Sequence, residues 1–125
     1  MEYIGGFFAV NTDALEWEDG SAILGLPEGV EIKAIREGYD EVSERTERFV
    51  RFPPGYVEPR HEHDHYHCIY ILEGSGLYLR EGVPPVPIQA GQFIIVPRNV
   101  FHGMRNTGGT RLSYLGVNGG AEPSA

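Results

Sequence analysis

The sequence predicts a single all-β domain, an antiparallel sandwich or barrel built from about seven short strands. Three observations support this fold class. Short apolar runs recur along the chain and are separated by turn residues. The chain contains 17 glycines and 9 prolines among its 125 residues, which is typical of many tight turns. That length fits one domain with room for a proper core.

The first two expected strands lie in the middle of the N-terminal half. Val30–Arg36 alternates apolar and polar residues, as a half-buried strand does. Residues Glu37–Glu41 predict a turn after it. Thr46–Phe52 is the second expected strand, and Pro53-Pro54-Gly55 closes it. Before these strands, residues 13–20 are typical of a helical turn or a loop.

Three further features follow the histidine-rich stretch. Cys68–Leu72 is apolar at successive positions, so we expect a strand that is covered on both faces. Glu73–Gly76 predicts a hairpin turn, and Leu77–Arg80 is the expected return strand. Gly82–Ile88 is rich in proline, which cannot donate to a central ladder, so this segment predicts an edge strand.

Two strands complete the expected set. Phe93–Val96 is apolar throughout and predicts another buried strand, and Thr110–Val117 predicts the last one. The resulting organisation is an N-terminal extension over residues 1–29 that packs on the barrel, a barrel over residues 30–117, and a frayed tail over residues 118–125.

Charge and composition exclude several classes of partner. The formal net charge of −8 argues against nucleic acid, whose phosphates require a basic face, and against anionic membranes. No apolar run is long enough to span a bilayer. Met1–Val10 lacks the basic residues of a signal peptide, and Cys68 is the single cysteine, so no internal disulfide can form. We therefore expect a cytoplasmic protein.

Four histidines predict a metal centre. If the chain is extended here, His61, His63 and His67 lie on one side of the backbone, and His102 follows a strand and a Pro-x-Asn turn that can return it to the same interior. Buried imidazoles need a partner, and a divalent metal supplies one. Four imidazoles would leave two open positions on an octahedral ion. The alternative is a surface tract that binds metal adventitiously.

The same residues resemble the two conserved motifs of the cupin superfamily. Gly55, His61, His63 and Gly74 match the first motif, with His67 in the place of its glutamate. The second motif is matched by Gly91, Pro97, Asn99, His102 and Asn106, with Asn99 in the place of a glycine. Asparagine is the best non-glycine residue where a turn requires a positive φ, so the replacement at position 99 is compatible with the fold.

The resemblance implies a cupin-type double-stranded β-helix, which is a small jelly-roll barrel. With His67 in place of the glutamate, the chain looks like the four-histidine cupins, which include iron, manganese and zinc proteins. The resemblance thus implies one divalent ion, with Fe or Mn favoured over Ni or Zn. Neutral ligands make the ion a stronger Lewis acid and disfavour its trivalent state.

Three other residues are candidates for catalysis. By resemblance, Arg48 and Tyr114 line the metal cavity, and an inward arginine can hold a carboxylate or enolate. The alternative places Arg48 outward and Phe49 inward, and Tyr114 can also serve only to fill space. His65 lies between the ligands, where it is either an exposed histidine at the pocket mouth or an acid–base group.

These features leave three functions open. The leading one is a dioxygenase that uses Fe(II) or Mn(II) on a small oxygenated molecule such as a β-diketone, enol or phenol. The second is a lyase, isomerase or cyclase that uses the metal as a Lewis acid without redox change. The third is a non-catalytic module that binds a sugar or small metabolite. Because cupins commonly pair their sheets, we also expect a homodimer.

Overall fold

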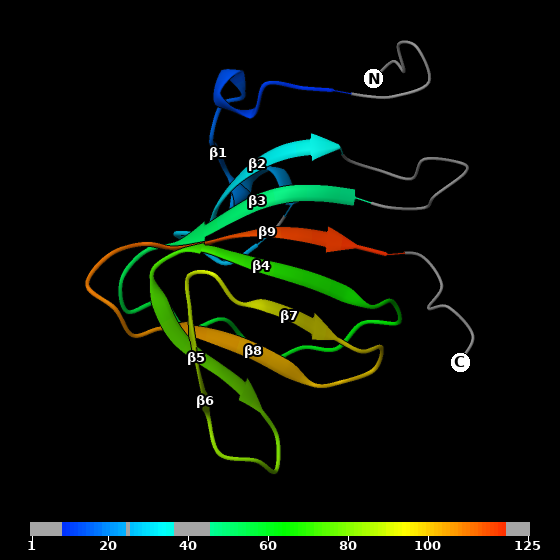
Figure 1. The fold of residues 1–125 in the computed structure, drawn as a ribbon, viewed down its shortest axis with the longest axis vertical. Coiled ribbons are helices and arrows are strands. Elements are labelled where there is room, and N and C mark those ends of the chain that lie inside the picture. The colour runs from blue at the N-terminus through cyan, green and yellow to red at the C-terminus, as the bar shows by residue number, and fades with distance from the viewer. Residues whose placement is uncertain (1–8, 25, 37–45, 120–125) are drawn as a thin grey trace.

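The computed structural model describes residues 9–24, 26–36 and 46–119, and they form two packed antiparallel sheets (Figure 1). In chain order the elements are η1 (Thr12–Ala14), β1 (Glu18–Asp19), α1 (Gly20–Leu24), β2 (Glu31–Arg36), β3 (Thr46–Phe52), β4 (His67–Glu73), β5 (Ser75–Arg80), β6 (Val86–Gln89), β7 (Phe93–Val96), β8 (His102–Asn106) and β9 (Leu112–Asn118). The larger sheet has the order β1-β2-β3-β9-β4-β7, and the smaller has β6-β5-β8. This is the all-β jelly roll that the sequence predicted.

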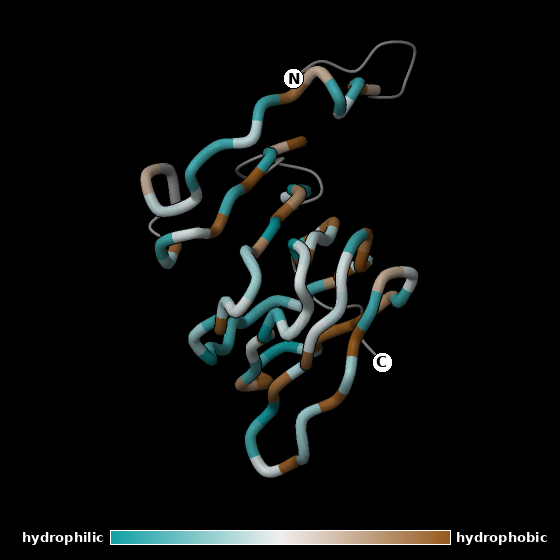
Figure 2. The backbone as a smooth tube through the Cα atoms, turned by 90° about the vertical axis from the view of Figure 1, so that its left-hand side faces the viewer, coloured by the Kyte–Doolittle hydropathy of each residue, from teal (hydrophilic) through white to brown (hydrophobic). Residues whose placement is uncertain are grey.

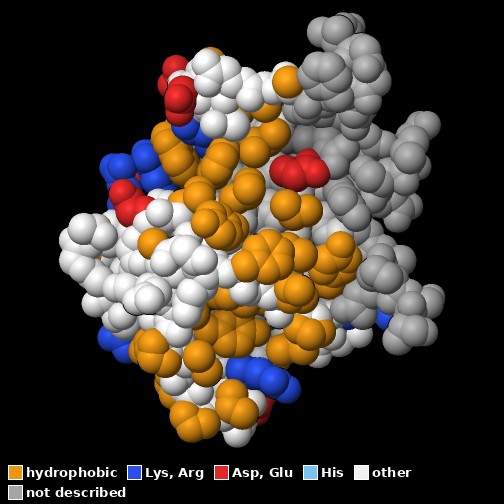
Figure 3. All heavy atoms as spheres, in the orientation of Figure 1, with side chains coloured by type: hydrophobic (Ala, Val, Ile, Leu, Met, Phe, Trp, Pro, Cys, Tyr) orange, Lys and Arg blue, Asp and Glu red, His pale blue; other side chains and the backbone are white. Residues whose placement is uncertain are grey.

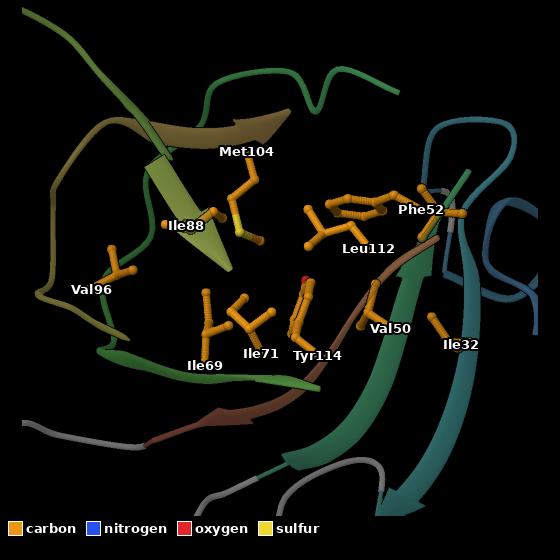
Figure 4. Packing of buried hydrophobic residues seen from close by; sticks show 11 residues of the cluster. Ile32, Val50, Phe52, Ile69, Ile71, Ile88, Val96, Met104, Leu112 and Tyr114 are labelled. Carbon is orange, nitrogen blue, oxygen red and sulfur yellow. The ribbon is translucent and has the colours of Figure 1, made fainter. Parts of the chain in front are cut away.

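The core lies between the two sheets. Ile69 and Ile71 of β4 are buried against Ile88 of β6 and Met104 of β8, and Leu112 of β9 is fully buried with them (Figure 4). Alternate residues of each strand face this interior, as the pleat requires. The described apolar residues therefore form one contiguous core.

The expected hairpin at Glu73–Gly76 is wrong. β4 pairs with β7 and β9, whereas β5 pairs with β6 and β8, so the turn carries the chain from one sheet to the other. Gly74 has a φ of +90°, and a β-carbon there would collide with the backbone carbonyl of Arg111. The glycine thus permits a tight corner between sheets.

Two expectations about burial also need correction. Phe93–Val96 is the edge strand β7, and the side chains of Phe93 and Ile95 are each 61% exposed. On β4, Tyr70 and Leu72 are 42% and 44% exposed, so only one face of that strand is covered within this chain. In β4 and β7, apolar side chains on both faces of a strand therefore do not imply that both faces are buried within this chain.

Other differences concern the boundaries of elements. The segment His102–Asn106, not expected as a strand, is β8. Asn118 is the last residue of β9, and residues 120–125 of the expected tail lie outside the described residues. The expected turn Glu37–Glu41 also lies outside them.

The N-terminal segment lies at one end of the larger sheet (Figure 2). β1 pairs with β2, and the guanidinium carbon of Arg51 lies 3.9 Å from the centre of the Trp17 ring. Arg51 also forms a hydrogen-bonded ion pair with Glu31, with its Nε 3.0 Å from Oε1. These contacts attach the described part of the segment to the strand pair β2–β3.

Candidate metal centre

A strand-like segment before the histidines runs antiparallel to β8. The backbone N–H of Glu58 donates to the carbonyl of Met104 at 2.9 Å. His61 and His102 exchange two backbone hydrogen bonds, each 2.9 Å long. Because this is a directly paired position, the two imidazole rings lie side by side, with centroids 4.7 Å apart.

The structure brings together His61, His63 and His102. One ring nitrogen from each lies within 4.8 Å of the others, in the only such group found among the described residues. His102 is buried at 2% exposure. The first and third come from the paired segments, and the second from the loop that leads into β4.

Backbone carbonyls determine which nitrogen of each ring is available. The Nδ1 atoms of His61, His63 and His102 lie 3.0, 2.7 and 2.7 Å from the carbonyl oxygens of Pro59, His65 and Val100. A carbonyl only accepts, so each Nδ1 carries the proton and each Nε2 has a free lone pair. The Nε2 of His63 is buried without a hydrogen-bond partner. Such orphaned imidazole nitrogens fit a divalent transition metal.

His67 lies beside this group and not within it. Its ring centroid is 5.7 Å from that of His63, in an edge-on arrangement. Its Nδ1 is also buried and without a partner. A β-carbon on Gly116 would lie 3.0 Å from the Nε2 of His67, so the glycine leaves space for this ring. The structure therefore places His67 next to the trio, as a candidate for a fourth ligand.

Burial disfavours the charged form of three of these imidazoles, those of His63, His67 and His102. Desolvation lowers the pKa of His67 to about 3, and the neighbouring histidines lower it further. Desolvation likewise lowers the pKa of His63 and His102. Neutral imidazole is the form that binds a metal, so burial prepares His63, His67 and His102 for metal binding at neutral pH.

His65 packs on the metal-facing cluster without joining it. Its ring is stacked on that of His63, with centroids 4.3 Å apart and an interplanar angle of 10°. Its Nδ1 lies 3.6 Å from a carboxylate oxygen of Asp64, whose side chain is almost fully exposed at 97%. The residue lines the adjoining cavity.

A cavity of about 250 Å³ adjoins the histidines. Arg48 and Tyr114 both line it, the first from β3 and the second from β9. Arg48 therefore faces inward, the first of the two orientations considered for it. Tyr114 is 5% exposed and also packs edge-on against Phe52, with ring centroids 5.9 Å apart. Burial raises the pKa of Tyr114 well above its usual value, so its hydroxyl stays protonated.

Among the residues of the cavity wall that sequence reasoning missed are Tyr56 and Glu58. Desolvation raises the pKa of Glu58 to about 7, and nearby His61 opposes the shift. Desolvation also raises the pKa of Tyr56 to about 12. Strict alternation from His61 would place Glu58 on the outer side, and a glutamate before a proline is typical of an exposed turn, so no sequence signal marks Glu58 as a cavity residue.

Two asparagines brace the frame around the site. Asn99 has a φ of +60°, the left-handed conformation expected of the motif turn. The buried amide of Asn106 donates to the carbonyls of Phe52 and Thr110 at 3.2 and 2.9 Å. Its Oδ1 accepts from the backbone of Gly108 at 3.0 Å. Asn106 thus ties β3, β8 and the turn before β9 together.

No helix among the described residues has the length and apolar character needed to cross a bilayer.

The chain is similar to known proteins of one fold. It is 35% identical over 69 residues to an oxalate-binding protein of Thermotoga maritima, a match that covers 54% of this chain and 56% of that protein. It therefore matches little more than half of that relative's length. A crystal structure from the same organism, described as a predicted oxalate decarboxylase, superposes with a TM-score of 0.74 at 26% identity, covering 90% of this chain and 98% of that one.

A more distant structure shows the same fold. The polyketide cyclase RemF of Streptomyces resistomycificus has a TM-score of 0.76 at 21% identity, covering 94% of this chain and 82% of that one. The model of the cupin domain family matches residues 48–118, which is more than half of the 125-residue chain. This match, together with the two-sheet jelly roll and the histidine trio at the motif positions, shows that the chain belongs to the cupin superfamily.

Proposed function

We propose that this cupin is an enzyme that holds one divalent transition metal on His61, His63, His67 and His102 and acts on a small oxygenated organic anion. One observation carries the proposal. Three histidines have their Nδ1 atoms held by backbone carbonyls, so their Nε2 atoms converge beside a cavity. Surface histidine tracts that bind metal adventitiously lack such hydrogen bonds from the ring Nδ1 atoms to backbone carbonyls.

Arg48 is the proposed partner of the substrate's negative charge. It projects from β3 opposite Gly116 of β9, and both residues line the cavity. A guanidinium beside the metal can hold a carboxylate or enolate by two parallel hydrogen bonds. Similarity to a protein that by its name binds oxalate supports an anionic oxygen ligand of this kind.

The first proposed reaction class is a dioxygenase. When bound, Fe(II) or Mn(II) supplies a redox-active centre at which a chelated enolate can react with dioxygen. The chain's own residues would hold the substrate. Arg48 would bind its negative charge, and the protonated hydroxyl of Tyr114 would donate a hydrogen bond to it. The buried walls of the cavity limit access of water.

A second reaction class needs no redox change, and Glu58 favours it. A lyase, isomerase or cyclase requires a group that moves protons, and a carboxyl with a pKa of about 7 in the cavity wall suits that role. When the carboxylate accepts a proton from the substrate carbon, the negative charge passes to the substrate oxygens beside Arg48. His65, which also lines the cavity, can exchange protons with solvent.

Metal identity and oxygen uptake distinguish these classes. Elemental analysis of the protein purified without added metal gives the ion, and an oxygen electrode with a panel of 1,3-diketones and phenols gives the reaction class. Iron or manganese with oxygen uptake supports the dioxygenase. Zinc or nickel with anaerobic turnover supports the second class. Ligand binding without any turnover would overturn the proposal of an enzyme and leave a binding module.

We further propose that the chain forms a homodimer through the outer face of β4 and β7. Tyr70, Leu72, Phe93 and Ile95 are exposed there by 42%, 44%, 61% and 61%. Hydrophobic side chains gather across this face (Figure 3). β7 is a sheet edge, so a second copy can cover the apolar side chains. Light scattering should give twice the chain mass, and a monomer at high concentration would refute the dimer.

A further inference from the structure

The cavity beside the histidines has two chemically different ends. The histidines border one end, where Gly116, the partner of Arg48 in the β3–β9 pair, lies against His67. At the other end the lining residues are Phe52 and Tyr56, whose rings lie 4.6 Å apart between centroids. Phe52 lies four positions after Arg48 on β3, which corresponds to roughly 13 Å along a strand. A ligand bound at the metal can therefore extend to a second, aromatic subsite.

The chain before β2 closes this second end. Ile32 pairs with Val50, so two residues earlier Val30 lies on the same inner face, level with Phe52. Val30 is 3% exposed in the protein core and yet borders the cavity, as do Leu26 and Pro27. Figure 4 shows Phe52 and Val50 facing the same interior space as Tyr114.

This wall is fixed to the barrel by backbone hydrogen bonds. The N–H of Gly20 donates to the carbonyl of Val30 at 2.8 Å, and the N–H of Leu26 donates to the carbonyl of Gly20 at 3.2 Å. The backbone carbonyl of Val30 would lie 2.9 Å from a β-carbon on Gly20. Backbone hydrogen bonds thus hold the apolar wall in place as part of the cavity.

The size and polarity of the cavity indicate what it accommodates. An apolar cavity of about 150 Å³ is enough to bind benzene, and this one is about 250 Å³. A small dianion such as oxalate would reach the metal end and leave the aromatic end empty. The hydroxyl of Tyr56 is buried at this end without a hydrogen-bond partner, so it can also serve a polar substituent of a bound ring.

We propose that the substrate carries, besides its chelating oxygens, an apolar group of at least the size of a phenyl ring, which lies between Leu26, Phe52 and Tyr56. Only the chelating half of this inference rests on the proposed function. The apolar half rests on the cavity wall itself. The substrate class is therefore an aryl- or branched-alkyl-substituted enol, diketone or phenol, and not a simple dicarboxylate.

Calorimetry on the zinc-loaded full chain tests the complete proposal. The two probes are acetylacetone and 1-phenylbutane-1,3-dione, which share one chelating group and differ by a phenyl ring. After correction for each diketone's affinity for free zinc, the phenyl compound should bind at least about tenfold more tightly, because several more carbons become buried. Leu26→Ser should reduce that ratio below about threefold and leave acetylacetone binding unchanged.

Val83→Ser is the matched control, because Val83 is 46% exposed and lies outside both the cavity and the proposed dimer face. It should leave the ratio as in the parent chain. Equal affinities for the two diketones, with zinc bound, would overturn the further inference and leave the proposed metal centre standing. Failure to bind zinc would overturn the proposed function instead.

A second measurement tests the apolar subsite without any metal. Benzene titrated into the metal-free protein should shift the methyl resonances of Leu26, Val30 and Val50 in carbon–proton NMR spectra. The methyl groups of Val83, which is exposed and does not line the cavity, should not shift. Absence of shifts at the three cavity residues at millimolar benzene would overturn the inference whatever the metal experiment gives.

Discussion

The trio His61, His63 and His102 differs from His67 in what holds each ring. In the trio, each Nδ1 donates to a backbone carbonyl, so the backbone orients the ring before any metal arrives. His67 has no such bond at Nδ1, and its ring is positioned by packing against Gly116 and near Tyr114, whose ring centroid is 6.3 Å away. Pre-oriented ligands contribute more to metal affinity than ligands that must be ordered on binding.

The largest expected effect comes from removing a member of the trio. His102→Ala should lower zinc affinity at least about 100-fold, because second-sphere changes alone cost 10–100-fold and this one removes a ligand. Competition with a chromophoric chelator measures the affinity. His65→Ala is the control, since its ring stacks on the site without facing the metal group, and it should change affinity less than about threefold.

A smaller loss should follow from His67→Ala. Metal content by elemental analysis should fall, and affinity should drop by about tenfold, less than for His102→Ala. Unchanged metal stoichiometry would show that His67 is not a ligand. A loss equal to that of His102→Ala would remove the distinction between rings held by the backbone and the ring held by packing.

Asn106 tests whether the frame behind the trio matters for folding. Its buried amide makes three hydrogen bonds to backbone groups near β3 and β8. Asn106→Ala should lower the free energy of unfolding by about 2–3 kcal/mol in urea denaturation, because backbone carbonyls lose their donor. The partly buried Asn118, whose side chain donates to the hydroxyl of Thr46, offers a control: Asn118→Ala should cost less than about 1 kcal/mol.

The smallest expected effect is a pH dependence that involves His67. Its pKa is lowered to about 3 in the folded, metal-free chain, from an ordinary value of 6.5. Below pH 6.5 the unfolded chain therefore binds a proton that the folded chain does not, so stability falls as the pH drops. Between pH 7.5 and 5.5 this residue should account for roughly 1 kcal/mol. His67→Gln, with EDTA present, should have a flatter profile of unfolding free energy, and an identical slope would contradict the assignment.

Local pattern was sufficient for much of the fold. The segment Thr46–Phe52, closed by Pro53-Pro54-Gly55, predicted β3 with its observed bounds, and the prolines near Val86–Gln89 predicted an edge strand. Local sequence pattern failed to predict features that depend on tertiary structure, such as strand pairing and burial. A turn at Gly74 looks the same whether its strands pair with each other or enter different sheets. The exposure of Phe93 depends on which strand ends a sheet.

The candidate site shows the same limit. Motif spacing brought His61, His63, His67 and His102 into one hypothesis, and the structure places the first, second and fourth together with the third alongside. Glu58 could not be recognised in the same way, because its burial depends on the pairing of its segment with β8. The apolar end of the cavity could not be predicted from the sequence either, because it brings Leu26 together with side chains from distant strands.

His102 begins β8 of the smaller sheet and His61 is bridged to it, whereas His67 begins β4 in the larger sheet. An ion bound by these histidines would therefore connect the two sheets at one end of the barrel. Metal binding should then raise the melting temperature of the parent chain, and the increase should grow with metal concentration. The reason is that the ion binds the folded state and not the unfolded state. A simple thermal scan could thus report which ions the centre accepts before any substrate is known.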